Sequence, residues 1–415
     1  MKQSFLPLLA ATQLLAASSH AGNWTEFRGP TGQGNISLKN LPLEWSDTKN
    51  VAWKQEIPGQ GWSSPVLYQG KLYVTTALMP APETGNKLSL KAVCLDAESG
   101  KVIWTTEIFA KDSVPGIHSK NSHASATPLI DGNRLYVHFG HHGTACLALD
   151  GKVIWRQETL GYSPVHGNGG SPVIVDNALI YSADGASDPF VVALDKRDGK
   201  VIWKVARVTP AKKKFSFCTP LVITVNGQKQ VISPGSGAVC AYDPKDGREI
   251  WRARYGEGYS VVPRPVFGHG MIFLSSGYDR PVAMAIRVDG QGDVTDTHVA
   301  WTMTKGAPNT PSMVLDGDEL YMLSDAGIAS CVDAKTGTVH WQERVCGTSS
   351  SSPLLVNGRI YFQDETGLTV VVKAGKTFEK IASNALNERT LASCAAEDGA
   401  LFIRAESHLY KIAAK

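Results

Sequence analysis

The segment ALDKRDGKVIW (residues 193–203) decides the fold of this chain, because close copies of it recur along the sequence. The shared pattern is an Asp, three residues, a Gly, three further residues and a Trp. It is found at residues 96–104, 195–203, 243–251 and 333–341, with a shortened version at 149–155. A pattern that returns at a nearly constant interval predicts that one small structural unit is repeated.

Tryptophan marks one position of each unit and gives the length of the repeat. The intervals range from 40 residues, between Trp301 and Trp341, to 51 residues, between Trp53 and Trp104. Each unit has room for four short strands separated by Gly-containing turns, which is the composition of one propeller blade. A large ring at a fixed place can bury its face against the next sheet. We therefore predict a structural docking role for Trp53, Trp104, Trp155, Trp203, Trp251, Trp301 and Trp341.

The two ends of the chain predict how the repeat closes. The last unit ends after three strands, whereas residues 51–57 (VAWKQEI) carry a Trp strand ahead of the first complete unit. This segment would complete the last blade and remove an open sheet edge. The sequence therefore predicts one all-β, eight-bladed propeller over residues 51–415; two four-bladed domains are the alternative. The innermost strands should start near Ser64, Thr127, Ser171, Thr219, Arg264, Thr310, Ser352 and Ser393.

The residues before the propeller indicate export and an N-terminal arm. Lys2, an apolar stretch at 5–17 and Ser19-His20-Ala21 together have the pattern of a signal peptide cleaved after Ala21. The mature protein should then be periplasmic or secreted. Residues 22–50 form the arm, and we expect its Trp24 and Trp45 to pack on the outside of the propeller.

Composition excludes several classes of protein. The chain has 41 basic and 38 acidic side chains in 415 residues, so no global charge favours a nucleic-acid partner. After the N-terminus no apolar run approaches the roughly 20 residues needed to span a bilayer. Seven cysteines cannot all pair within one chain, and most lie in apolar runs, so we expect buried thiols rather than a disulfide framework. We expect a monomer.

The full pattern Ala-x-Asp-x-x-x-Gly-x-x-x-Trp, complete at 193–203 and 241–251, resembles the tryptophan-docking repeat of pyrroloquinoline-quinone-type propellers. The resemblance covers residues 51–415. The opening WTEFRGPTGQG (residues 24–34) is similar to that of secreted bacterial quinone-like repeat proteins. In this family the tryptophan packs between neighbouring blades.

The resemblance implies one of two functional classes. In quinoprotein dehydrogenases the quinone and a calcium ion lie over the central channel, whereas non-catalytic propellers such as the outer-membrane assembly lipoprotein bind protein partners. This sequence has no adjacent Cys-Cys pair, no Cys-x-x-Cys-His and no evident set of calcium carboxylates. We therefore expect a binding or scaffold module without a cofactor. The alternative is an enzyme, either a quinoprotein-like oxidoreductase with pyrroloquinoline quinone and calcium or a metal-dependent enzyme.

Propeller topology places the loop that enters each blade and the loop between its second and third strands on one face. The irregular sequence falls on this face, which we call the irregular face, and such loops usually carry function. The candidate ligand-binding residues there are Trp62, His118, Lys120, His123, His141, His142, His166, Asn168, Asp184, Tyr259, Arg264, Tyr278, Arg280 and Arg389.

Histidine and basic residues suggest which ligands this face would take. We predict no metal site; the strongest candidate ligands would be His141, His142, His166 and Asp184, since imidazole and carboxylate suit zinc. The basic side chains favour an acidic glycan, an acidic small molecule or an envelope protein that presents carboxylates. An unperturbed His titrates near pH 6.5, so we expect the face to gain positive charge on mild acidification.

Overall fold

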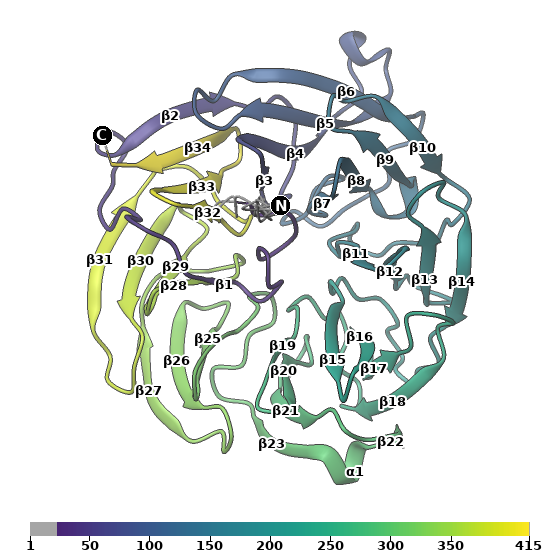
Figure 1. Cartoon of the computed structure of the whole chain (residues 1–415), viewed down its shortest axis with the longest axis vertical. Coiled ribbons are helices and arrows are strands. Elements are labelled where there is room, and N and C mark those ends of the chain that lie inside the picture. The colour runs from purple at the N-terminus through teal and green to yellow at the C-terminus, as the bar shows by residue number, and fades with distance from the viewer. Residues whose placement is uncertain (1–22, 415) are drawn as a thin grey trace, which may run out of the picture.

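The computed structural model describes residues 23–414, which form a ring of eight antiparallel sheets, or blades, around a central channel (Figure 1). The innermost strand of each blade lies next to the channel. The predicted all-β, eight-bladed propeller is thereby confirmed. The expected signal peptide (residues 1–21) lies outside the described residues.

The strands follow the ring in chain order. Blades one to four are β3 to β6 (Val66–Tyr68, Lys71–Leu78, Leu88–Asp96, Val102–Lys111), β7 to β10 (Leu129–Asp131, Arg134–His138, Thr144–Ala148, Val153–Gln157), β11 to β14 (Val173–Val175, Ala178–Ala183, Phe190–Asp195, Val201–Ala206) and β15 to β18 (Leu221–Val225, Gln228–Gly235, Ala238–Tyr242, Glu249–Arg254). Blades five to seven are β19, β20, β21 and β23 (Val266–Gly268, Met271–Ser275, Ala283–Arg287, Val299–Met303), β24 to β27 (Val314–Asp316, Glu319–Leu323, Ile328–Asp333, Val339–Arg344) and β28 to β31 (Leu354–Val356, Arg359–Gln363, Leu368–Lys373, Lys380–Ala385).

The eighth blade combines both ends of the chain. It contains β32 (Ala395–Glu397), β33 (Ala400–Arg404), β34 (His408–Ala413) and β2 (Val51–Glu56). β2 pairs antiparallel with β34, with Trp53 opposite Lys411. The predicted closure by the N-terminal strand is therefore confirmed, and Figure 1 shows β2 beside β34.

Few other elements interrupt this plan. Two short strands, β1 (Asn35–Ile36) and β22 (Gly292–Asp293), add a fifth strand to blades seven and four. The helical segments are η1 (Pro82–Thr84), η2 (Gly140–His142) and α1 (Thr295–His298). No helix within residues 23–414 is long and apolar enough to cross a membrane. The seven cysteines carry free thiols and six of them are buried, as the sequence predicts.

Six of the seven repeat tryptophans donate an indole hydrogen bond to the blade that follows. The Trp203 ring lies against Gly247 in the next blade, where a Cβ atom would come within 2.6 Å of the ring. Gly247 also has a φ of 75°, so the turn needs glycine for both space and backbone conformation. The indole Nε1 of Trp203 donates a hydrogen bond to the carbonyl of Pro244 at 2.9 Å. A ring stacked on a glycine and held by its N–H fixes the distance between two blades.

The same indole contact recurs around the ring with one exception. Corresponding carbonyl acceptors in the next blade are Ala97 for Trp53, Leu149 for Trp104, Lys196 for Trp155, Ala334 for Trp301 and Gly375 for Trp341. Trp251 instead donates to the side chain of Gln230 in its own blade at 2.9 Å. Between β21 and β23 of blade five, β22 and α1 stand in place of the Asp-x-x-x-Gly turn.

The segment before β2, residues 23–50, crosses the ring on the side opposite the irregular face. In this arm, the carbonyl of Thr25 accepts a hydrogen bond from the Ile130 amide in β7. The carbonyl of Phe27 accepts one from the Arg264 guanidinium at 2.6 Å. β1 then pairs in parallel with β28. Because these contacts reach blades two, five and seven, the arm covers this end of the channel (Figure 1).

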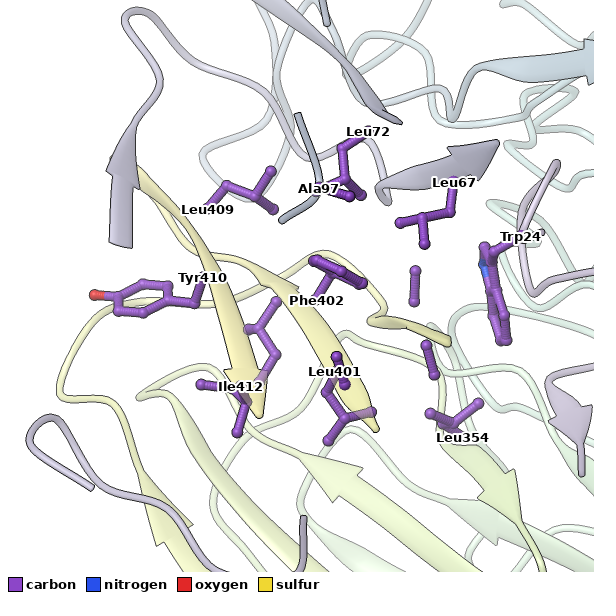
Figure 2. Close-up of a cluster of buried hydrophobic side chains, with 14 of the residues drawn as sticks. Trp24, Leu67, Leu72, Ala97, Leu354, Leu401, Phe402, Leu409, Tyr410 and Ile412 are labelled. Carbon is purple, nitrogen blue, oxygen red and sulfur yellow. The ribbon is translucent and has the colours of Figure 1, made fainter. Parts of the chain in front are cut away.

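The arm is part of the core, so the expectation that its tryptophans pack on the outside of the propeller is wrong for Trp24. Trp24 is only 1% exposed and exchanges backbone hydrogen bonds with Leu67 in the innermost strand β3. Figure 2 shows its ring at the edge of a cluster of apolar side chains from blades one, seven and eight. Trp45 is also buried and stacks on Tyr361 of blade seven, with ring centroids 6.4 Å apart.

The docking contact predicts a large effect of removing one repeat tryptophan. Trp203→Ala should lower the free energy of unfolding by about 3–5 kcal/mol, the usual cost of deleting a buried aromatic ring. Chemical denaturation of the parent and the variant measures this difference. Ile202→Ala, at the exposed neighbouring position, should change stability little. Equal, small effects of the two substitutions would contradict the docking role.

The contacts of Glu388 predict that its contribution to the stability of the closed ring depends on pH. Its carboxylate accepts hydrogen bonds from the Ser407 amide, the His408 ring and the Tyr410 hydroxyl, and it lies 3.5 Å from Lys54 in β2. Burial alone would raise the pKa of Glu388, but these hydrogen bonds lower it to about 2. A depressed carboxyl pKa stabilises the fold above the unfolded value, and the effect is lost as the pH falls.

Glu388→Gln should therefore be less stable than the parent at pH 7, and the difference should shrink as the pH falls from about 4.5 to about 2. Thermal melts across this range measure it. Glu379→Gln breaks an exposed ion pair with Lys373 and serves as the control. A difference between parent and Glu388→Gln that stays constant with pH would refute the proposed electrostatic role.

Candidate functional site

A cavity of about 300 Å³ lies at the mouth of the channel on the irregular face. Its walls come from the entering loops of all eight blades, with Tyr278 from the loop after β20, and Phe27 of the arm contributes to its lining. The volume is at the lower end of the range for small-ligand pockets, about 300–1,000 Å³. We call it the channel-mouth cavity.

A circle of hydroxyl side chains surrounds the cavity at the start of the innermost strands. The Ser64 amide donates to the Thr127 hydroxyl at 3.0 Å, and the Thr127 amide donates to the Ser171 hydroxyl at 2.9 Å. The same bond joins Ser171 to Thr219, Arg264 to Ser312, Ser312 to Ser352, and Ser352 to Ser393. We call these seven Ser and Thr residues the hydroxyl collar. They join equivalent points of neighbouring blades.

Arg264 occupies the collar position of blade five, where no hydroxyl is present. Its side chain is 2% exposed and donates to the carbonyls of Pro220 and Phe27 and to the Glu26 carboxylate at 2.9, 2.6 and 3.1 Å. The structure therefore places this predicted ligand-binding residue in the anchor of the arm rather than on the surface of the irregular face.

Aromatic rings form a continuous arc along one side of the mouth. His118, His166, Phe215 and Tyr259 follow one another with each pair of ring centroids 5.4 Å apart, and Tyr278 lies 6.5 Å from Tyr259. These rings come from blades two to five and line the cavity. We call this row the aromatic arc.

Trp62 lies on the other side of the mouth. The Arg389 guanidinium lies over its ring, 5.7 Å from the centroid, in a cation–π contact between blades one and eight. The mouth therefore has aromatic surface on both sides, partly supplied by residues that the sequence predicts as ligand contacts.

A long loop between β6 and β7, residues 112–128, reaches across part of the mouth. On one side the Asn121 amide donates to the carbonyl of His166 in blade three at 2.7 Å. On the other side Lys120 forms an ion pair with Glu365 of blade seven at 2.7 Å. We call this segment the cap loop, because it is held at both sides of the opening.

The cavity is almost free of charge. Lys120 is the one charged side chain in the lining of the described cavity, and Glu365 neutralises it. No Asp or Glu lines the cavity within residues 23–414. Burial and the neighbouring His118 lower the pKa of His166, so this ring is neutral at neutral pH. The lining therefore offers hydroxyls, amides and aromatic faces rather than charges.

The other predicted histidines lie behind the cavity. His142 Nε2 is 3.3 Å from His123 Nδ1, and the His141 and His142 rings have centroids 3.8 Å apart. Burial lowers the pKa of His141 to about 4 and that of His142 to about 3, and it also lowers the pKa of His123. The expectation that these imidazoles charge on mild acidification is therefore wrong for His141 and His142, which remain neutral.

The four side chains suggested as metal ligands do not come together. Asp184 is buried in an ion pair with Arg207 at 2.9 Å, whereas His166 faces the cavity. Within residues 23–414 no three His, Cys, Asp or Glu side chains are arranged to hold a metal ion.

The predicted residues thus divide by place. Trp62, His118, Lys120, His166, Tyr259 and Tyr278 line the cavity. Arg389 contacts Trp62, Arg280 is exposed on the loop after β20, and Asn168 accepts a hydrogen bond from Tyr162 behind the arc. Sequence reasoning missed Phe215 and Phe217 as well as Phe27 of the arm. Phe215 and Phe217 lie close together in the irregular loop entering blade four, and this aromatic pair could have indicated them as lining residues.

Comparison with known proteins identifies related chains of two kinds. Residues 50–181, 89–311 and 292–400 match the family model described as outer membrane protein assembly factor BamB. The chain is 23% identical over 349 residues to BamB of Yersinia pestis, a match covering 80% of each protein. It is 25% identical over 307 residues to the dehydrogenase subunit of a quinone alcohol dehydrogenase of Komagataeibacter europaeus.

The two kinds of relative differ in how much of their length is matched. The dehydrogenase match covers 68% of this chain but only 36% of the relative. A lanthanide-dependent methanol dehydrogenase of Methylorubrum extorquens is 32% identical over 155 residues, with 33% of this chain and 24% of that protein covered. This chain therefore spans about a quarter to a third of the length of these dehydrogenases.

Solved structures of both kinds share the fold. BamB from Moraxella catarrhalis aligns with a TM-score of 0.62 at 12% identity, over 87% of this chain and 96% of that one. A europium-containing methanol dehydrogenase aligns with a TM-score of 0.64 at 11% identity, over 94% and 91%.

The buried histidines predict a loss of stability below about pH 6.5. Unfolded imidazoles bind protons there, whereas folded His141 and His142 stay neutral to about 4 and about 3. Each such imidazole costs about 1.4 kcal/mol per pH unit over this window. The free energy of unfolding, measured with urea, should decline between pH 6.5 and 4.5, and less steeply in His142→Gln.

His298→Gln, on the surface segment α1, is the control and should keep the parent's slope. Parallel pH profiles for the parent and His142→Gln would show that the buried ring does not resist protonation.

Proposed function

This chain belongs to the family of quinone-like repeat propellers described as outer membrane protein assembly factor BamB, and we propose that it is a non-catalytic binding module of the cell envelope. In this proposal, a ligand or partner is held at the channel-mouth cavity. Export through the predicted signal peptide would place the chain in the periplasm or outside the cell. The match to BamB of Yersinia pestis, which covers 80% of each protein, supports this class.

The observation that carries the proposal is the lining of the cavity. It combines aromatic rings and hydroxyls from all eight blades, with a single charged side chain that is already paired. A concave site with apolar rings and a few convergent polar groups is the usual form of a binding pocket. Ser350 of the lining donates a hydrogen bond to the Glu365 carboxylate at 2.5 Å, but the ion pair of Glu365 with Lys120 weakens this carboxylate as a general base.

The quinone and its metal ion, which the dehydrogenase relatives suggest, do not fit this lining. Calcium takes six to eight oxygen ligands, among which carboxylates are prominent. The cavity offers hydroxyls but no carboxylate, and the nearest one in the cap-loop contact, Glu365, is bound to Lys120. The acidic groups of the quinone would likewise meet no unpaired cation among the lining residues. This mismatch favours binding without a redox cofactor.

The experiment is capture of envelope components by the immobilised mature chain. Trp62→Ala removes aromatic surface from the mouth and should abolish specific capture by the parent. Ile202→Ala, exposed on the outer strand β14, is the matched control and should capture as the parent does. Addition of pyrroloquinoline quinone and calcium should give no alcohol-dependent dye reduction.

Two results would overturn the proposal. Capture that is the same for Trp62→Ala and the parent would place the binding surface elsewhere. Dye reduction that depends on the quinone would instead support the dehydrogenase class.

A further inference from the structure

We propose that the channel-mouth cavity binds the terminal residue of an uncharged saccharide. This inference rests on the proposed binding function and adds the chemical class of the ligand. It differs from the expectation of an acidic glycan, because the lining of the described cavity carries less charge than the surrounding loops.

The shape of the cavity favours the terminal unit of a polymeric ligand over an internal segment. The arm crosses the opposite side of the ring, and Phe27 reaches the lining. A ligand can therefore enter from the irregular face but cannot pass through the propeller. The cap loop further narrows the approach by joining blades three and seven. A volume of about 300 Å³ then admits a small terminal unit rather than a long polymer segment.

The hydroxyl collar provides unused hydrogen-bond donors. Collar members such as Thr127 and Ser171 accept an amide N–H from the previous blade, and within residues 23–414 they donate to no acceptor. A hydroxyl has one donor and two acceptor sites, so each can still bind a ligand oxygen. The collar hydroxyls that line the cavity are Ser64, Thr127, Ser171, Ser312, Ser352 and Ser393. Such a circle suits a ligand rich in hydroxyl groups.

The aromatic arc provides the complementary apolar contact. A pyranose ring has faces of C–H groups and a rim of hydroxyls. Its faces can stack on Phe215 while its rim reaches the collar. On Tyr259 and Trp62 it would use the ring face opposite the cation, because Lys213 and Arg389 lie over these rings, 4.0 and 5.7 Å from the centroids. Burying an aromatic face against an apolar surface contributes both area and a specific geometry.

The lack of free charge in the cavity lining favours an uncharged saccharide over ligands that end in a charged group. A polypeptide that entered by its end would bring a charged amino or carboxylate group into a lining without a free counter-charge, which is costly. A phosphate or acidic sugar would meet the same difficulty, because the cations at the mouth already have partners: Lys120 pairs with Glu365, Arg389 pairs with Glu406, and Lys213 donates to the Tyr259 hydroxyl. A neutral sugar can satisfy its polar groups by hydrogen bonds alone.

The test is calorimetric titration of the full mature chain with uncharged trisaccharides, namely maltotriose, cellotriose and chitotriose. A trimer of galacturonic acid is the charged counterpart. At least one uncharged trimer should bind, and it should bind at least 10-fold more tightly than the acidic trimer. Trp62→Ala and Tyr259→Ala should each weaken this binding at least 10-fold, whereas Tyr259→Phe, which keeps the ring, should retain it.

Ile202→Ala is the matched control and should bind the trimer as the parent does. Failure of every uncharged trimer, while Trp62→Ala still abolishes capture from envelope extracts, would overturn the saccharide and leave the proposed function standing. Stronger binding of the acidic trimer, or saccharide binding unaffected by the Trp62 and Tyr259 variants, would overturn the assignment of the ligand class or of its site.

Discussion

The contact of a tryptophan in one blade with a glycine in the next is the constraint on which the rest of the structure depends. At Trp203 and Gly247 a methyl group in place of the glycine hydrogen would leave no room for the indole. Because this contact and its indole hydrogen bond recur between most blades, the spacing of the ring is set at its outer side. The innermost strands can then be short, and the loops before them can vary without loss of the ring.

Two features on the inner side of the ring, the hydroxyl collar and Arg264, determine where the site lies. The hydroxyl collar joins equivalent points of neighbouring blades through the amide-to-hydroxyl bonds that begin at Ser64 and end at Ser393. Its series is interrupted at Arg264, where the side chain turns to the arm instead. Arg264, at the one collar position without a hydroxyl, therefore anchors the arm over one end of the channel. The other end remains available for a ligand.

The blades could be predicted from the sequence because their signals are local and repeated, as in residues 193–203. The loops that meet at the mouth could be assigned to one face by topology, which placed Trp62 and Tyr259 correctly among its residues. The roles of Arg264 and Trp24 could not be predicted, since their partners are distant in sequence and occur once. The neutrality of His142 could not be predicted either, because it depends on burial that composition does not reveal.

The pairing of β2 with β34 makes the order of synthesis matter. The strand that closes the ring, β2, precedes strands β3 to β31 of the other blades in the chain, whereas its partner β34 follows them. Until β34 has been synthesised, β2 has no partner and remains an unpaired edge. The growing chain therefore exposes an unpaired strand edge, which promotes association with other chains. Assembly in the cell must keep it apart from its neighbours until the final strand arrives.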